Sequence, residues 1–219
     1  MKLIKPYTEI LTPINGEEIL KILEKVARTC YKSEDKITNE SAPKLVKALI
    51  ERGHEAMIEF FDITVKFVCD RGVSHELVRH RIASFAQEST RYVNYSKGNF
   101  EGDLIFIIPN WITLPEGIHT YDGLCTQDCT INNWLHIMNQ SEQSYNTLIK
   151  EGWQPQQARS VLPNSLKTEI NIKMNLREWR HFFKLRCEKA AHPQMRELTI
   201  PLLEELKSKI PIIFDDITY

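Results

Sequence analysis

The chain has 219 residues, of which 42% are hydrophobic, and a formal net charge of −1 at pH 7. This length and composition fit a globular chain that buries its own core, and we expect a single catalytic domain over residues 1–219. The near-neutral charge excludes a protein that binds polyanions with its whole surface, so any basic site has to be local.

The cysteines and apolar runs predict where the protein works. Five cysteines at irregular spacing argue against a secreted disulfide framework. Cys125 and Cys129 fit neighbours on a helix better than zinc ligands, so we expect no metal. The first residues lack the apolar core of a signal peptide, and no apolar run approaches the ~20 residues of a membrane span. We therefore expect a soluble, cytoplasmic protein with no membrane partner.

Apolar spacing and turn residues predict the elements in chain order. The predicted elements of the first half are a strand over 3–11, a helix capped by Asn15, a helix after Ser41, a strand over 62–70, a short helix to about 81 and an extended segment over 87–96. Those of the second half are a short apolar run over 104–108, one long helix over 122–151, a helix over 155–163, a strand over 168–174, a helix from Asn175 to about 189 and a last helix over 193–209. Helices and strands do not alternate regularly, which favours an α+β fold with mixed helices around a small antiparallel sheet.

Basic residues concentrate in two stretches, residues 71–97 and 175–196. In a chain of this net charge, such unevenness indicates a small anionic ligand. Arginine suits a phosphate because its planar fork makes two parallel charged hydrogen bonds. Solvated helix faces are the alternative on charge alone.

The spacing within the first stretch favours a ligand site. Arg79, His80 and Arg81 are consecutive, so on a helix they would point about 100° apart and could not share one solvated face. Further donors follow within ten residues: Ser84, Gln87, Ser89 and Arg91.

In the second stretch, Arg186 lies on the same helical stripe as Trp179 and Phe182. A guanidinium that faces inward needs a partner because it stays protonated in proteins. A structural ion pair or a snorkelling side chain is the alternative to a ligand contact.

The run RHRIASFAQESTRY, which starts at Arg79, resembles the signature of the flavin-dependent thymidylate synthases: RHR, seven residues, then Ser89. The supporting segments, in the family's order, are Gly53–Phe60, Ala158–Pro163, Asn175–Arg177, Leu185–Arg186 and His192–Gln194. The resemblance covers about residues 15–207, which is most of the chain.

The resemblance implies a flavin-dependent thymidylate synthase-like fold and a homotetramer with FAD sites built from more than one subunit. It implies reductive methylation of dUMP to dTMP, with 5,10-methylenetetrahydrofolate as one-carbon donor and NADPH as the reductant of FAD. The implied partners are further copies of the chain, dUMP, folate and NADPH, without nucleic acid.

Carried over by position, the resemblance implies two sets of contact residues. For FAD these are His54 and Ala56 from a neighbouring chain, with Arg79, His80, Arg81, Gln87, Asn175, Leu176, Arg177 and His181. For dUMP they are Glu76, Leu77, Val78, Arg79, Gln87, Glu88, Ser89, Thr90, Arg91, Arg159 and Arg186. Four positions depart from the family pattern: Glu76 stands where many members have Gln, Ala86-Gln87 where many have Asn-Glu, and His181 where many have Asn. We expect Glu76 to pair with Arg79, three residues further on.

The motif suggests how uracil C5 is activated. No cysteine falls inside it, so we expect no cysteine nucleophile, and Ser89 would need an adjacent base to act as one. The implied place of Arg186, beside N3 and O4 of the base, would stabilise negative charge on the ring, which makes Arg186 the predicted catalytic residue.

A nucleotide- or single-strand nucleic-acid-binding module that uses Arg71–Lys97 is the alternative. Its stacking groups would be Tyr92, Tyr95 and Phe100. A phosphoryl-transfer enzyme is disfavoured because the chain lacks a glycine-rich phosphate loop.

Overall fold

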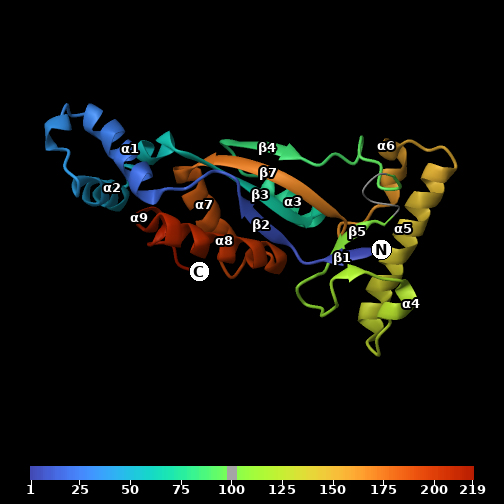
Figure 1. The fold of residues 1–219 in the computed structure, drawn as a ribbon. Helices are drawn as coiled ribbons and strands as arrows, with labels where there is room; N and C mark the ends of the chain where they lie inside the picture. The colour runs from blue at the N-terminus through green and yellow to red at the C-terminus, as the bar shows by residue number, and fades with distance from the viewer. Residues whose placement is uncertain (98–102) are drawn as a thin grey trace. The chain divides into compact units, whose positions relative to one another are not determined.

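The computed structural model describes residues 1–97 and 103–219 (Figure 1). Helices and strands are mixed along the chain, as the sequence predicts. The chain divides into two compact units. The first unit comprises Met1–Tyr7, Phe67–Arg79 and Ala86–Ile170, and the second comprises Thr8–Lys66, His80–Phe85 and Asn171–Tyr219. That one catalytic domain spans residues 1–219 stays a prediction.

The strands form two sheets. The three-stranded sheet has the order β5-β1-β6, with bounds Ile105–Ile107, Lys2–Ile4 and Gly117–Ile118. The four-stranded sheet has the order β2-β3-β7-β4, with bounds Tyr7–Ile10, Asp62–Asp70, Lys167–Asn175 and Ala83–Gln87. Leu3 pairs in parallel with Phe106 and antiparallel with Gly117. The predicted antiparallel arrangement is therefore wrong for the β1–β5 pair.

The predicted strand over residues 62–70 is confirmed as β3. Its alternate residues Ile63, Val65, Phe67 and Cys69 are completely buried, which is the period of two that predicted it. The strand predicted over 3–11 is instead the two strands β1 and β2, and Pro6 lies in the break between them. Proline has no N–H to donate to a ladder, which accounts for the interruption.

The core of the first unit forms around β1, β5 and helix α5 (Cys129–Lys150). The single helix predicted over 122–151 is two helices, α4 (Tyr121–Leu124) and α5. They are separated because the Asp128 carboxylate accepts from the Thr130 backbone N–H at 2.8 Å and so starts a new helix. The buried face of α5 carries Leu135, Met138, Ser141 and Tyr145. Ile137 of the same helix is 49% exposed, although it neighbours Met138.

Two shorter helices of the first unit also differ from their predicted bounds. Helix α3 (Arg71–Leu77) is capped by Asp70, whose carboxylate accepts from the Val73 N–H at 2.7 Å, and it ends before residue 81. Residues 155–163 form α6 (Pro155–Ala158) and the short 3-10 helix η4 (Arg159–Val161). The prediction of an extended segment over 87–96 is wrong. Only its first residue belongs to β4, and the rest forms turns and irregular structure.

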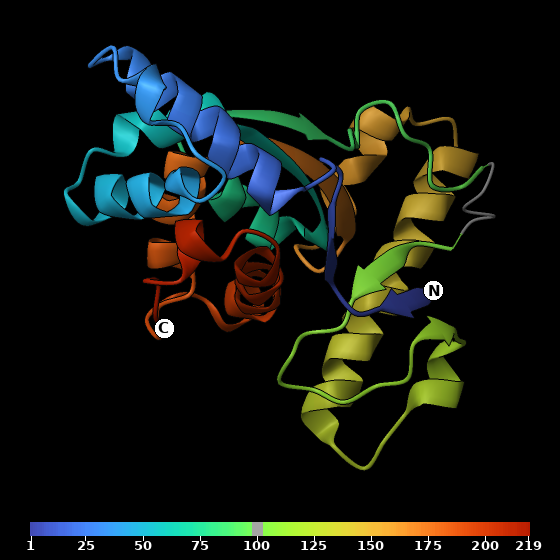
Figure 2. The same ribbon diagram turned by 60° about the vertical axis from the view of Figure 1, so that its left-hand side comes forward.

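The second unit is mainly helical. Its helices are α1 (Gly16–Thr29), η1 (Glu34–Lys36), α2 (Ser41–Glu51), η2 (Glu55–Phe60), α7 (Leu176–Arg186), α8 (Pro193–Lys209) and α9 (Pro211–Phe214). Helices α1 and α2 lie side by side (Figure 2). The predicted N-caps Asn15 and Asn175 are confirmed, since each side-chain oxygen accepts a backbone N–H three residues on. The last predicted helix is confirmed as α8, although the short α9 follows it.

Helix α7 positions the residues of the site described below, and aromatic packing holds it in place. Trp179, Phe182 and Phe183 are completely buried and contact one another edge to face or stacked. The Trp179 indole N–H also donates to the Ile63 carbonyl of β3 at 3.0 Å. Each buried ring removes about 200 Å² from water, a gross gain on the order of 5 kcal/mol before entropy is subtracted. The orientation of α7 is therefore tightly determined.

Within the described residues, none of the helices has both the length and the apolar character that crossing a membrane requires.

Candidate active site

The chain turns sharply in the second unit, directly after the RHR motif. Ile82 follows the motif directly and has a φ of 61°, in the left-handed region that β-branched residues rarely adopt. Its side chain is 79% exposed, whereas His80 is only 5% exposed. Such strain is retained where the surroundings enforce it, often at binding sites. The turn sends His80 into the unit and presents Ile82 at its surface.

Arg186 contacts the RHR motif through His80. The Arg186 Nε–H donates to His80 Nε2 at 2.9 Å, across 106 positions of sequence. The His80 ring packs edge to face on Phe182, with 4.8 Å between ring centroids. The partner expected for the inward-facing Arg186 is thus a histidine of the other basic stretch.

The contact with Arg186 determines where the His80 proton lies. Burial first, then the positive charges of Arg186 and His181, lowers the pKa of His80 from 6.5 to about 4. Because a guanidinium can only donate, Nε2 of the neutral ring is the acceptor and the proton is on Nδ1. Nδ1 lies 3.7 Å from Oε1 of Glu178, a carboxyl whose pKa is raised by burial.

His80, Glu178 and His181 resemble a metal-ligand set, since their ligand atoms all lie within 4.8 Å of one another. A cation would need the lone pair of His80 Nδ1. That nitrogen is protonated as long as Nε2 accepts from Arg186. The hydrogen bond from Arg186 and a cation bound at Nδ1 are therefore mutually exclusive.

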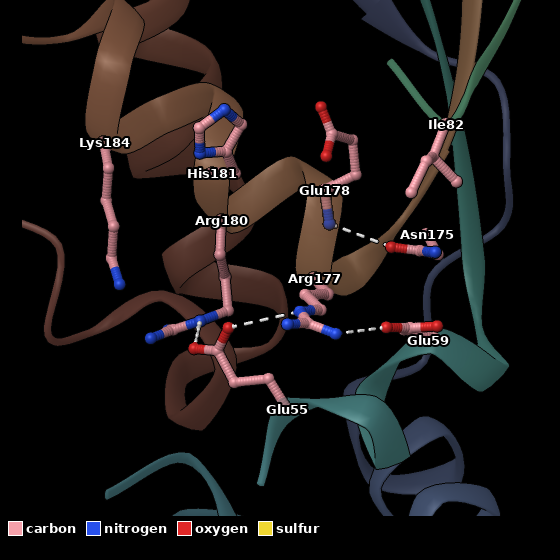
Figure 3. Close-up of a pocket in the computed structure, with 9 residues that line it drawn as sticks. All are labelled: Glu55, Glu59, Ile82, Asn175, Arg177, Glu178, Arg180, His181 and Lys184. Atoms are coloured by element: carbon pink, nitrogen blue, oxygen red, sulfur yellow. Dashed lines mark hydrogen bonds and ion pairs between the residues drawn. The ribbon is translucent and has the colours of Figure 1, made fainter. Parts of the chain in front are cut away.

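A cavity of about 450 Å³ opens beside this cluster (Figure 3). It is lined by Glu55, Glu59, Ile82, Asn175, Arg177, Glu178, Arg180, His181 and Lys184. Three predicted FAD residues, Asn175, Arg177 and His181, are thus brought together. Lys184 was missed, although it follows Arg177 and His181 at helical spacing, a pattern that could have identified it.

Ion pairs occupy part of this cavity. Arg177 Nη1 lies 2.6 Å from Glu59, and its Nε lies 3.8 Å from Glu55. Arg180 is 2% exposed; its Nε donates to Glu55 at 3.1 Å, and its fork donates to both Asp216 oxygens at 2.6 and 2.8 Å. Arg180 also donates to the Ile213 carbonyl. Arg180 therefore anchors the wall of the cavity.

The donors in this cavity fit part of a cofactor with a diphosphate. Arg177, His181 and Lys184 reach the cavity from one side of α7, and phosphate oxygens need such donors. The Arg177–Glu59 pair is exposed, and exposed ion pairs contribute little, so an anion can displace Glu59. The Asn175 oxygen already accepts from the Glu178 N–H at 2.9 Å, which leaves the amide N–H groups as its donors to a ligand.

Other predicted FAD residues do not line this cavity. His54 and Ala56 flank Glu55 and are exposed, and Arg81 is exposed as well. Leu176 is completely buried, so its side chain cannot contact a ligand. Arg79 and Gln87 belong to the first unit.

Another cavity, also of about 450 Å³, lies in the first unit. It is lined by Arg71, His75, Thr90, Gln156, Arg159, Ser160, Leu162, Pro163 and Asn164. Two predicted dUMP residues meet here, since Arg159 Nη1 donates to Thr90 Oγ1 at 3.3 Å. Arg71 Nη1 is buried and has no hydrogen-bond partner among the described residues. A buried unsatisfied donor on a cation indicates a place for an anion.

Arg71 and His75 were missed by sequence reasoning. They are four residues apart, at the spacing that places two side chains on one helix face. The pattern was available in the sequence, although it does not show that one guanidinium nitrogen of Arg71 is buried while His75 is exposed.

Several predicted dUMP residues have structural partners in the first unit. The Gln87 amide nitrogen donates to Ser74 at 3.0 Å and Thr168 at 3.2 Å. Glu88 accepts from the Tyr95 hydroxyl at 2.8 Å and from Lys167 at 3.0 Å. The side chain of Glu88 is thus committed to a local ion-pair network.

The other predicted dUMP residues differ in exposure. Leu77 is buried, whereas Arg79 and Arg91 are exposed. Glu76, Val78 and Ser89 are half-buried. Arg79 Nε donates to the His75 carbonyl at 3.3 Å, Ser89 Oγ accepts from the Arg91 N–H at 3.3 Å, and the Arg91 guanidinium lies 5.2 Å from the Tyr92 ring centroid. The pairing of Glu76 with Arg79 stays a prediction.

The alternative hypothesis, a single-strand nucleic-acid-binding module, predicted three aromatic stacking residues, and the prediction is wrong for one of them. Tyr95 is 3% exposed and its hydroxyl is bound to Glu88, so its ring cannot stack on a base. Tyr92 is exposed, and Phe100 lies outside the described residues. The structure therefore does not favour a single-strand binding face over Arg71–Lys97.

Comparison with known proteins identifies the family. Residues 15–212 match the family described as thymidylate synthase complementing protein. The chain is 31% identical over 197 residues to the flavin-dependent thymidylate synthase of Geobacter sulfurreducens, covering 87% of this chain and 78% of that protein. It is 32% identical over 211 residues to the enzyme of the same name from Corynebacterium efficiens, covering 94% and 81%.

A solved structure shares the fold. The UMP/dUMP methylase PolB of Streptomyces cacaoi, bound with 5-Br dUMP, superposes with a TM-score of 0.76 at 21% identity, covering 98% of this chain and 96% of that chain. The family model and the two relatives show that the chain belongs to the family of flavin-dependent thymidylate synthases.

Proposed function

We propose that this protein catalyses the reductive methylation of dUMP to dTMP, with 5,10-methylenetetrahydrofolate as carbon donor and NADPH-reduced FAD as hydride source. The family and the names of its relatives support this reaction. The observation that supports it is the hydrogen bond between Arg186 and His80, which brings the proposed catalytic residue against the histidine of the RHR motif.

Arg186 is the proposed catalytic residue. Carbon 5 of uracil is a poor nucleophile, and a fixed guanidinium beside N3 and O4 would stabilise the anionic ring and raise electron density at C5. The alternative activation, thiolate addition at C6, is not supported by the buried cysteines, because burial raises the pKa of the Cys69 and Cys187 thiols. The exposed cysteines Cys30, Cys125 and Cys129 line neither of the two cavities described above, so the proposed reaction uses no cysteine nucleophile.

The substrate phosphate is proposed to lie in the cavity of the first unit. Arg159 and Thr90 line it, and the buried Arg71 Nη1 supplies a third donor. Two or more charged donors around one phosphate are strong and directional. The remaining proposed dUMP contacts come from the backbone of Glu76–Arg79 and from Gln87–Arg91.

FAD is proposed to lie against α7 and the RHR turn. When bound and reduced, it supplies the hydride. Asn175, Arg177 and His181 would hold its polar groups, and Ile82 would offer an apolar surface at the rim of the cavity. His54 and Ala56 would reach the cofactor of a neighbouring chain, which requires the proposed homotetramer. We place the enzyme in the cytoplasm.

Two observations on the purified protein test the reaction. Bound flavin gives a yellow solution with visible absorbance, and incubation with dUMP, methylenetetrahydrofolate and NADPH should convert dUMP to dTMP, detected by chromatography. Omitting any one co-substrate is the control. A flavin-loaded protein that forms no dTMP under these conditions would contradict the proposal.

A further inference from the structure

The side chain that holds Arg186 is the feature with the clearest functional consequence. We propose that His80 is a positioning residue, which fixes the plane of the Arg186 guanidinium by accepting the hydrogen bond from its Nε. The inference rests on the proposed function in one respect: it takes Arg186 as the group that acts on the pyrimidine ring.

A hydrogen bond at Nε constrains an arginine more than one at a terminal nitrogen. Nε is the atom that joins the planar fork to the flexible stem, so an acceptor lying in its direction sets the orientation of the whole plane. Arg186 is the last residue of α7, and long helical side chains point back toward the helix N-terminus. His80 meets it there at 2.9 Å.

His80 is itself held in place. Its ring is 5% exposed and packs edge to face on Phe182 at 4.8 Å. Nδ1 faces Glu178 at 3.7 Å, and Glu178 is tied to the first turn of α7 through its N–H, which donates to the Asn175 cap. The strained Ile82 turn brings this histidine into position. A proton on Nδ1 directed at a carboxylate keeps Nε2 available as the acceptor.

Two substitutions of nearly equal polarity separate the positioning role from a general one. In His80→Gln the side-chain oxygen can take the place of Nε2 and accept from Arg186. In His80→Asn the amide is shorter and reaches only the place of Nδ1, so the acceptor for Arg186 is lost. The matched control is His136→Asn, an exposed histidine on α5 outside both cavities.

The measurement is kcat and KM for dUMP, at saturating flavin and with flavin content quantified. We expect His80→Asn to lower kcat about 10- to 100-fold with KM for dUMP changed less than about threefold, because a misplaced catalytic group affects turnover more than binding. His80→Gln should recover most of kcat, and His136→Asn should match the wild type. Equal losses in the Gln and Asn variants, or a change in KM alone, would overturn the positioning role.

A spectroscopic readout does not depend on activity. Nitrogen-15 NMR of the histidine rings should show His80 as the Nδ1–H tautomer in the wild type. Arg186→Met, which removes the donor, should release this preference. An Nε2–H tautomer in the wild type would overturn the inference even if dTMP is formed, whereas an inactive enzyme with the Nδ1–H tautomer would contradict only the proposed function.

Discussion

At the scale of single residues, some residues of the candidate site can be identified from the sequence motif. Others are identified only from their burial in the structure. Thr90 and Arg159 were predicted from the family resemblance and do line one cavity. Arg71 was predicted only as part of a basic stretch, since its identity as a buried, unsatisfied donor depends on the packing around it. Charge can be read from a sequence, but the desolvation that gives a charge its specificity cannot.

Arg71→Ala should weaken the binding of dUMP. A charged hydrogen bond to phosphate contributes about 1.5–3 kcal/mol, so we expect KM for dUMP to rise roughly 10- to 100-fold with kcat little changed. Steady-state kinetics measures this, with Arg52→Ala, an exposed residue after α2, as the control. Unaltered KM in Arg71→Ala would exclude Arg71 from the substrate site.

Asp216→Asn should destabilise the second unit by removing the charge that balances the buried Arg180. We expect a loss of about 2 kcal/mol at pH 7, measured by urea denaturation. The exposed pair Lys173–Asp62 provides the control, since Asp62→Asn should cost less than about 1 kcal/mol.

The effect of Asp216 should depend on pH in a defined direction. The hydrogen bonds from Arg180 lower the pKa of Asp216 below 3.8 in the folded protein. A carboxyl whose pKa is lower in the folded than in the unfolded protein stabilises the fold at pH values above its unfolded-state pKa. This stabilisation is lost as the pH falls through its folded-state pKa. The difference between wild type and Asp216→Asn should therefore shrink below about pH 4. A difference that grows on acidification would contradict the ion pair.

At the scale of elements, strong periodic patterns were predicted well and interruptions were not. The strand β3, the caps Asn15 and Asn175 and the start of α8 follow from local side-chain chemistry. The break between α4 and α5 depends on whether Asp128 caps a helix or continues one, a choice that tertiary packing decides. Helix α3 likewise ends at Leu77, whereas the sequence predicts a helix that continues to about residue 81.

Helix α7 depends on Asn175 both for its start and, in our proposal, for a cofactor contact. Asn175→Asp keeps the oxygen that accepts from Glu178, so we expect nearly unchanged stability. It removes the amide donor, so flavin affinity should fall. Asn175→Ala should lose about 1 kcal/mol of stability as well as flavin affinity. Thermal unfolding measures the stability and flavin titration measures the affinity. Equal flavin affinity in the wild type and in Asn175→Asp would exclude the proposed contact between the Asn175 amide and the cofactor.

At the scale of the whole molecule, the family resemblance implies an active site to which more than one chain contributes residues. His54 and Ala56 are exposed and do not line the cavity of their own chain. This is expected of residues that contact the cofactor of a neighbouring chain. Four chains of 25.6 kDa would form an assembly of about 102 kDa. Sedimentation equilibrium should give this mass, and a stable, active monomer would contradict the shared site.

In the proposed reaction, the guanidinium of Arg186 activates the uracil ring. Release of tritium from 5-tritiated dUMP, with folate and NADPH present, reports directly on chemistry at C5. We predict that Arg186→Lys, at saturating dUMP, releases tritium at least about 100-fold more slowly than the wild type, because a point charge does not reproduce the planar fork. Release at the wild-type rate by Arg186→Lys would contradict it.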